Sequence, residues 1–102
     1  MTEIRVIRYR TRPESAAENT DLIKAVFAEL AERDIDGIRY TALRLDDGVT
    51  FLHIAAIDSG ENPLESSPAF AAFQAGIGAR LEEGPFPDTA VVVGSYGDVI
   101  GT

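Results

Sequence analysis

The sequence has no cysteine and no tryptophan, and His53 is its only histidine. Without cysteine the chain can form neither a disulfide bond nor a thiolate metal site. We therefore expect a protein of the reducing cytoplasm. One histidine is also too few for an imidazole metal site within one chain, because such sites usually need three or four ligands. We predict no bound metal and no cofactor.

Basic residues are scarce, with 9 Lys and Arg against 17 Asp and Glu and a net charge of −8. Such a surface repels a phosphate backbone, so nucleic-acid binding is disfavoured. Four arginines do gather near the start, and we interpret them as solvated strand positions: Arg5, Arg8, Arg10 and Arg12. No apolar run approaches the roughly 20 residues of a membrane helix. The first ten residues are too charged for a signal peptide, so we expect neither a membrane span nor a targeting segment.

A length of 102 residues suits one domain, covering residues 1–102. Alternating apolar residues predict strands over 3–10 and 37–45, and nearly continuous apolar runs predict strands over 49–57 and 89–97. Spacings of three and four predict two helices. The first helix begins at Ser15 and carries Ala16, Asn19, Ile23, Val26, Phe27, Leu30 and Ala31 on one face. The second helix starts with Ser67 and Pro68 and carries Phe70, Phe73, Ile77 and Leu81.

Turn signals complete this pattern. Asp46, Asp47 and Gly48 predict a hairpin between the second and third strands. In the second helix, Gly76 and Gly78 are interpreted as marking close packing against a strand, and Glu82 and Glu83 as its solvated end. The resulting order is β-α-β-β-α-β, the ferredoxin-like arrangement of the α+β class. It implies a four-stranded antiparallel sheet with the first and third strands central and both helices on one face.

The helix-free face of this sheet should be polar in a monomer, but the third and fourth strands are apolar on both faces. An exposed apolar face and an apolar edge strand favour association. We therefore predict a twofold homodimer that packs through the helix-free face and encloses a pocket for a small apolar ligand. The alternative is a monomer whose loops fold over the sheet.

The chain resembles the dimeric α/β-barrel superfamily, in particular the antibiotic-biosynthesis-monooxygenase-like domains. The resemblance rests on the element order, on "GIRY" at the second strand, on "FLHIAAIDSGENPLESSPAFAAFQ" and on "VVVGSY". It implies a homodimeric α/β barrel. It also implies an activity such as that of the cofactor-independent monooxygenases that act on polycyclic aromatics. Those enzymes are expected to use a pocket with Trp, Asn and Tyr, whereas this chain lacks Trp and has only Asn19 and Asn62 as asparagines.

His53 interrupts the most apolar run of the sequence, and two interpretations follow. It is either a neutral structural histidine bonded near Tyr40 or Thr41, or a pocket base or hydrogen-bond donor for a phenolic or carbonyl substrate. Because Leu52, Ile54 and Ala56 are uniformly aliphatic, we expect them to face the helices. His53 would then face the dimer interior.

The neighbours of His53 on the second strand depend on the hairpin. A two-residue loop at Asp47 and Gly48 places Tyr40, Ala42 and Arg44 beside His53, and we favour it. A three-residue loop places Thr41 and Leu43 there instead, since a shift of one residue exchanges the faces.

Two functions remain open. The first is a monooxygenase-like enzyme acting on an apolar aromatic or related metabolite. Its catalytic candidate is His53, and its substrate-binding candidates are Tyr40, Phe51, Ala55 and Tyr96. Tyr9, Tyr40 and Tyr96 would also serve as interface packing. The second function is a non-catalytic dimeric module that binds a small ligand or is purely structural. A filled interior and a histidine bonded within the chain would favour this module, and an open cavity of several hundred Å³ would count against it.

Overall fold

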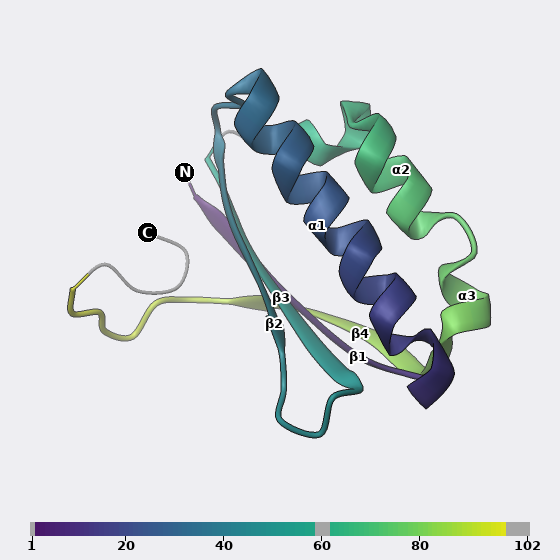
Figure 1. The fold of residues 1–102 in the computed structure, drawn as a ribbon. Coiled ribbons are helices and arrows are strands. Elements are labelled where there is room, and N and C mark those ends of the chain that lie inside the picture. The colour runs from purple at the N-terminus through teal and green to yellow at the C-terminus, as the bar shows by residue number, and fades with distance from the viewer. Residues whose placement is uncertain (1, 59–61, 98–102) are drawn as a thin grey trace.

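The computed structural model describes residues 2–58 and 62–97 and confirms the ferredoxin-like order. Four strands form one antiparallel sheet in the order β2-β3-β1-β4, with β1 and β3 central as predicted. The strands are β1 (Glu3–Thr11), β2 (Ile38–Arg44), β3 (Thr50–Ile57) and β4 (Leu81–Ala90). The helices α1 (Ala16–Arg33) and α2 (Pro68–Gln74) lie side by side on one face of the sheet (Figure 1).

Helix α1 follows a short 3-10 turn, η1 (Pro13–Ser15), and ends at Asp34, which adopts the left-handed conformation with φ 50°. Four residues of the predicted stripe are buried: Ala16, Asn19, Ile23 and Val26. Phe27 and Leu30 are partly buried against the core, whereas Ala31 is exposed, so its predicted place in the stripe is wrong. One of these residues is polar, because Asn19 is 0% exposed. A buried amide must find hydrogen-bond partners, so α1 contributes more than apolar packing to the interior.

The predicted second helix is divided in the structure. After the 3-10 turn η2 (Pro63–Ser66), Ser67 caps α2 by accepting a hydrogen bond from the Phe70 backbone N–H at 3.0 Å. Gly76 then takes the left-handed conformation with φ 74° and separates α2 from a single turn, α3 (Ile77–Arg80). A Cβ on Gly76 or Gly78 would meet nothing within 4 Å, so the expectation of close packing at these glycines is wrong. Glycine at position 76 instead permits the left-handed backbone conformation at low cost.

The fourth strand begins much earlier than predicted, at Leu81 instead of residue 89. Its register with β1 shifts around Arg10, where Gly84 adopts φ 93°. A Cβ on Gly84 would lie 3.1 Å from the Arg8 carbonyl oxygen, which explains why glycine is needed at this irregularity. Glu82 and Glu83 therefore belong to a strand, and the interpretation of them as a helix end is wrong.

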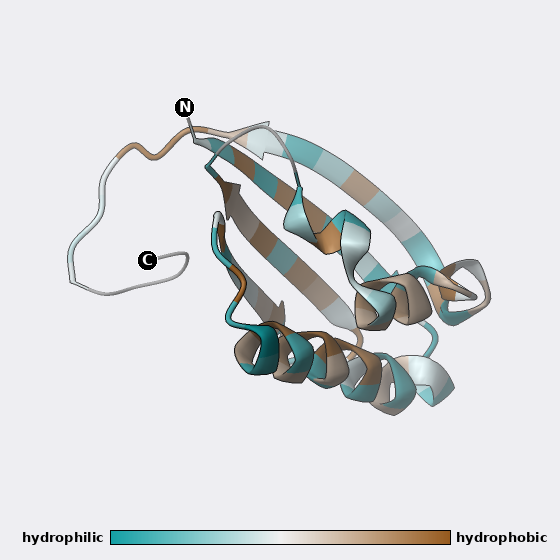
Figure 2. Ribbon diagram, turned by 90° about the horizontal axis from the view of Figure 1, so that it is seen from above, coloured by the Kyte–Doolittle hydropathy of each residue, from teal (hydrophilic) through white to brown (hydrophobic). Residues whose placement is uncertain are grey.

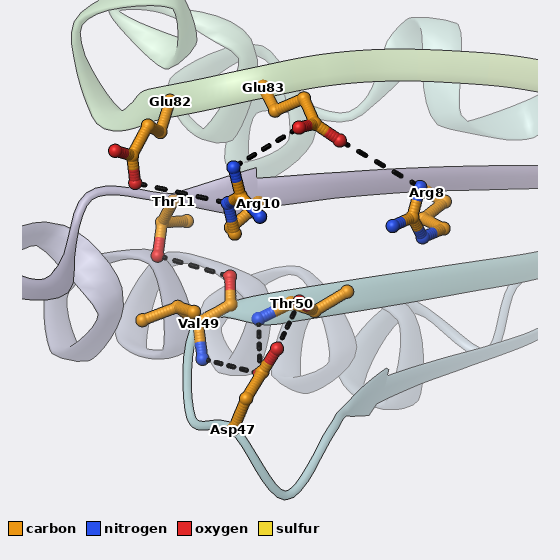
Figure 3. Close-up of polar contacts among 8 residues, drawn as sticks. All are labelled: Arg8, Arg10, Thr11, Asp47, Val49, Thr50, Glu82 and Glu83. Atoms are coloured by element: carbon orange, nitrogen blue, oxygen red, sulfur yellow. Dashed lines mark hydrogen bonds and ion pairs between the residues drawn. The ribbon is translucent and has the colours of Figure 1, made fainter.

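Charge pairing across β1 and β4 accompanies this register (Figure 3). Glu83 accepts a hydrogen bond from Arg10 at 3.1 Å and lies 4.0 Å from Arg8, and Glu82 lies 3.9 Å from Arg10. These side chains are about half exposed, so each pair contributes little to stability. The pairs place the arginines of β1 opposite the glutamates of the edge strand β4. The pattern of apolar residues could not predict this pairing.

The hairpin between β2 and β3 has the favoured register. Asp47 accepts hydrogen bonds from the backbone N–H groups of Val49 and Thr50 at 2.9 and 2.8 Å and from the Thr50 hydroxyl at 2.5 Å (Figure 3). These bonds hold the turn, and they lower the pKa of the Asp47 carboxyl. As a result, the pairs across β2 and β3 are Tyr40 with Ala55, Ala42 with His53, and Arg44 with Phe51.

His53 faces the helices, so the predicted orientation of β3 is wrong. Phe51, His53 and Ile57 are at most 5% exposed and lie on the helix-covered face. Leu52 and Ile54 lie on the helix-free face and are partly exposed. Uniform aliphatic character did not mark the covered side, because His53 finds its polar partners there in Tyr9 of β1 and Tyr40 of β2, and an aromatic neighbour in Phe73 of α2.

The helix-free face carries an apolar patch in the single chain. Its members are Ile4, Val6, Leu43, Leu52 and Ile54, all partly exposed, and Phe86, which is 50% exposed. Beyond β4 the chain continues away from the sheet (Figure 1), and its first part is strongly apolar (Figure 2). Val93 and Tyr96 in this tail are 99% and 95% exposed. Residues 91–96 were predicted as strand but are not part of the sheet.

Both main helices lie on the concave side of the curved sheet (Figure 2).

None of the helices in residues 2–58 and 62–97 is long and apolar enough to span a membrane.

Candidate functional site

A cavity of about 460 Å³ lies between the helix-covered face of the sheet and the segment from η2 to α3. Most of its wall is apolar, and one part is polar. The apolar lining consists of Ile7, Ala55, Ile57, Leu64, Phe70, Ala71, Phe73, Ile77 and Pro85. The polar lining consists of Arg5, Tyr9, Tyr40, His53, Asn62, Glu65, Ser67 and Gln74. This size and composition suit a small, largely apolar ligand with one or a few polar groups.

The polar part is centred on His53, whose two ring nitrogens each meet a tyrosine. The Tyr9 hydroxyl lies 2.7 Å from His53 Nε2, and the Tyr40 hydroxyl lies 2.5 Å from His53 Nδ1. The three residues come from β1, β3 and β2, which are adjacent in the sheet. All three side chains point to the helix-covered face, and both tyrosines are diagonal neighbours of His53, which pairs directly with Ile7 and Ala42.

Two further residues extend this cluster into the interior. Asn19 of α1 donates from Nδ2 to the Tyr9 hydroxyl at 2.9 Å, and Arg80 of α3 donates from Nε to Asn19 Oδ1 at 3.0 Å. Arg80 is 5% exposed and also donates to the backbone carbonyls of Phe73 and Ala75. Within residues 2–58 and 62–97, no carboxylate lies within 4.0 Å of its guanidinium. A buried cation is thus held by amide and carbonyl oxygens.

Burial keeps the imidazole and the two phenols of the cluster neutral. It lowers the pKa of His53 to about 4, because the imidazolium would lose its hydration. It also raises the pKa of Tyr9 to about 12, opposed by the Asn19 hydrogen bond and the Arg80 charge. The pKa of Tyr40 is raised further by burial and by Tyr9. At neutral pH the cluster therefore contains one neutral imidazole and two phenols.

Aromatic packing holds these groups in place. Tyr9 stacks on Phe51 with ring centroids 5.4 Å apart, and Phe27 stacks on Tyr40 at 4.9 Å. The Phe73 ring lies 5.6 Å from the imidazole of His53. In the described part of the chain, no three His, Cys, Asp or Glu side chains converge as metal ligands would. The site thus offers hydroxyl groups and an apolar surface for recognition.

The structure brings together three of the predicted site residues. His53, Tyr40 and Ala55 line the cavity. Phe51 instead lines a neighbouring cavity of about 420 Å³ beside α1, and Tyr96 lies in the exposed tail, outside both cavities. The cavity lies on the helix side of the sheet, not between two sheets as predicted.

Asn19 and Arg80 were missed as members of the site. Each had a sequence signal: Asn19 falls in the apolar stripe of α1, and Arg80 lies seven residues after Phe73, on the same face of the predicted second helix. A polar residue within an apolar stripe indicates a buried partner. The partner itself could not be read from the sequence, since Arg80 and Asn19 are 61 positions apart.

Comparison with known proteins supports the fold assignment. No protein-family model matches the sequence, and no curated protein matches it. Several solved structures do match. Rv0793 from Mycobacterium tuberculosis superposes with a TM-score of 0.74 at 19% identity, covering 95% of this chain and 100% of that chain. SnoaB from Streptomyces nogalater, a cofactor-independent oxygenase solved as a point mutant, has a TM-score of 0.66 at 17% identity, covering 92% of this chain and 95% of that chain.

A third structure, an antibiotic biosynthesis monooxygenase, has a TM-score of 0.66 at 12% identity, covering 92% of this chain and 100% of that chain. At such identities the likeness shows the fold alone. The chain therefore has the ferredoxin-like fold of these antibiotic-biosynthesis-monooxygenase-like structures, which confirms the fold that the sequence predicted.

Proposed function

We propose that this protein is a cofactor-independent oxygenase-like enzyme for an apolar aromatic metabolite bound in the helix-side cavity. The observation that carries the proposal is the cavity itself: about 460 Å³, mainly apolar, with Tyr9, His53 and Tyr40 as a polar wall. The fold shared with SnoaB, a cofactor-independent oxygenase, supports the same activity. His53 takes part by holding Tyr40, because both of its ring nitrogens are already hydrogen-bonded.

The proposed reaction converts a ring methylene beside a conjugated ketone into a second ketone. The substrate first loses a proton to solvent and becomes an enolate, whose oxygen is stabilised by a hydroxyl donor of the polar wall. The enolate carbon then reduces O₂ and forms a C–O bond, and the resulting peroxide anion takes a proton back from solvent to give a hydroperoxide. Loss of water breaks the O–O bond and leaves the new C=O. One O₂ is consumed, and one water and one diketone are formed.

A matched pair of helix variants tests this assignment. Both Ala71 and Ala72 of α2 are exposed, but only Ala71 lines the cavity. With anthrone as the probe, wild-type protein should consume O₂ and form anthraquinone in equal amounts. We expect Ala71→Trp to reduce kcat/KM about tenfold or more by filling the cavity, since a loss of about 1.4 kcal/mol has this effect. Ala72→Trp should stay close to wild type.

Equal activity of the two tryptophan variants would contradict the cavity as the reaction site. If anthrone binds in the cavity but no O₂ is consumed, the second candidate, a non-catalytic binding module, is correct. This candidate is favoured by the engagement of both nitrogens of His53, which leaves no free base in the cluster. Calorimetric titration of anthrone under nitrogen separates binding from turnover.

A second copy of the chain is proposed to cover the helix-free face. The apolar patch is partly exposed in one protomer, and the valine-rich tail beyond β4 extends past the sheet with its side chains exposed. Packing of two such faces would bury both features without any further element. The expected assembly is a twofold homodimer in which each protomer keeps its own helix-side cavity.

Sedimentation equilibrium checks this prediction. Wild-type protein should show about twice the 11.0 kDa mass of the chain at micromolar concentration. Ile54→Lys places a charge within the patch and should give the single-chain mass, because an unpaired charge is costly to bury. Leu45→Lys, in the exposed hairpin turn, should remain dimeric. A single-chain mass for the wild-type protein would contradict the dimer.

A further inference from the structure

The direction of the hydrogen bonds around His53 follows from one group that can only donate. A guanidinium has no acceptor, so the Asn19 atom that faces Arg80 Nε must be the amide oxygen. The Asn19 amide nitrogen then faces the Tyr9 hydroxyl and donates to it at 2.9 Å. The Tyr9 oxygen is therefore already an acceptor, and its own proton remains to be placed.

Among the residues that the structure describes, the Tyr9 proton has one suitable acceptor, His53 Nε2, at 2.7 Å. Tyr9 is 2% exposed, so a proton directed elsewhere would leave a buried donor unpaired, at a cost of about 1–3 kcal/mol. His53 Nε2 must then lack a proton. A neutral imidazole carries its single proton on the other nitrogen, so His53 is the Nδ1–H tautomer.

The Nδ1–H group donates to the Tyr40 oxygen at 2.5 Å. Tyr40 keeps its own hydroxyl proton, and within residues 2–58 and 62–97 no other hydrogen bond of this hydroxyl is present. Tyr40 lines the helix-side cavity. Each residue of the chain thus donates a hydrogen bond to the next residue. The chain starts at the Arg80 cation and ends at the Tyr40 hydroxyl, which keeps a free proton at the cavity.

We propose that this chain of five residues makes Tyr40 a hydrogen-bond donor to a bound ligand, and that the cavity selects an apolar ligand with a carbonyl or oxyanion acceptor. Arg80, Asn19, Tyr9 and His53 are positioning residues, and Tyr40 is the group that touches the ligand. The apolar wall near it, including Ile7, Phe70 and Ile77, accepts the hydrocarbon part. The ligand class rests on the proposed role of the cavity, whereas the direction of the hydrogen bonds does not.

Long-range ¹H–¹⁵N spectra of the single histidine test the direction without any ligand. At pH 8, wild-type protein should show the Nδ1–H tautomer. Asn19→Asp should show the Nε2–H tautomer, because a carboxylate accepts from both Arg80 and Tyr9 and leaves the Tyr9 oxygen to accept from His53. A wild-type Nε2–H tautomer, or an unchanged tautomer in a folded Asn19→Asp variant, would overturn the proposed direction.

Binding of a matched ligand pair tests the acceptor preference. Fluorene and 9-fluorenone differ only by the ketone, and wild-type protein should bind 9-fluorenone about tenfold more tightly, as one hydrogen bond allows. Tyr40→Phe should abolish the preference while keeping fluorene affinity. Thr41→Val, which removes a hydroxyl from the next residue, should retain the preference.

A preference that is absent in the wild type, or that survives Tyr40→Phe, would overturn Tyr40 as the donor. If neither compound binds, the cavity is not the ligand site and the proposed function fails with it. The tautomer result then still decides the direction of the hydrogen bonds, so the two failures are distinguishable.

Discussion

Replacing Asn19 with alanine is expected to lower the free energy of unfolding by about 3 kcal/mol, a large fraction of the stability of a domain of this size. Asn19 is fully buried and joins the Arg80 guanidinium to the Tyr9 hydroxyl. Its loss leaves one donor of a buried cation and one acceptor of a buried phenol without their partner. Breaking a hydrogen bond to a buried charge costs more than breaking a neutral one.

Urea denaturation measures this effect, and the neighbouring residue supplies the control. Glu18 precedes Asn19 on α1 but is exposed, so Glu18→Ala should change stability by less than about 0.5 kcal/mol. Asn19→Asp should be less damaging than Asn19→Ala, because a carboxylate can still accept from Arg80 and from Tyr9. An Asn19→Ala variant as stable as the Glu18→Ala variant would show that the buried network does not support the fold.

Acidification is expected to remove about 3 kcal/mol of stability through His53 alone. Its pKa is about 4 in the folded protein and 6.5 in the unfolded chain. Between these values the unfolded chain binds a proton that the folded protein does not, so stability falls as the pH drops from 6.5 to 4. A shift of this size corresponds to about 3 kcal/mol, at roughly 1.36 kcal/mol per pH unit. Above about pH 7 His53 is neutral in both the folded and the unfolded state, so its effect on the free energy of unfolding no longer changes with pH.

The difference between wild type and His53→Gln isolates this contribution, because titration of the carboxylates is common to both proteins. The groups facing His53 do not titrate in this window: burial raises the pKa values of Tyr9 and Tyr40, and Arg80 acts only through Asn19. The stability advantage of the wild type should therefore shrink steadily from pH 6.5 to 4. A pH-independent difference would indicate an exposed or charged imidazole.

The order of elements could be predicted because it depends on local signals. Alternation, three- and four-residue spacing and the Asp47–Gly48 turn each mark one element or connection. The register of β2 against β3 followed from the turn, and with it the pairing of Tyr40, Ala42 and Arg44 with β3. Local consistency of this kind is what specifies a fold before any tertiary contact is known.

The fourth strand could not be placed by the same signals. Valines at 91–93 looked like the best strand of the C-terminal region, yet β4 is the segment with Glu82, Glu83 and two prolines. An edge strand tolerates proline and charge, and here the charges meet Arg8 and Arg10 across the pair. The choice between the two segments is made by tertiary pairing and not by apolar character.

The geometry of the candidate site could be predicted only in part, for a related reason. That Tyr40 lies beside His53 followed from the hairpin register, but the face of the sheet did not. On the covered face, Asn19 and Arg80 from different helical segments provide the polar partners that continue the network from Tyr9. Contacts over such separations leave no pattern in a single sequence.

The central claim is that the histidine–tyrosine cluster forms the polar wall of a ligand site on the helix side of the sheet. The crystal structure of the protein with 9-fluorenone tests it most directly. The account predicts the ligand between β3 and α2, with its ketone oxygen about 3 Å from the Tyr40 hydroxyl. Ligand density confined to the helix-free face, or a ketone turned away from Tyr40 within the cavity, would contradict it.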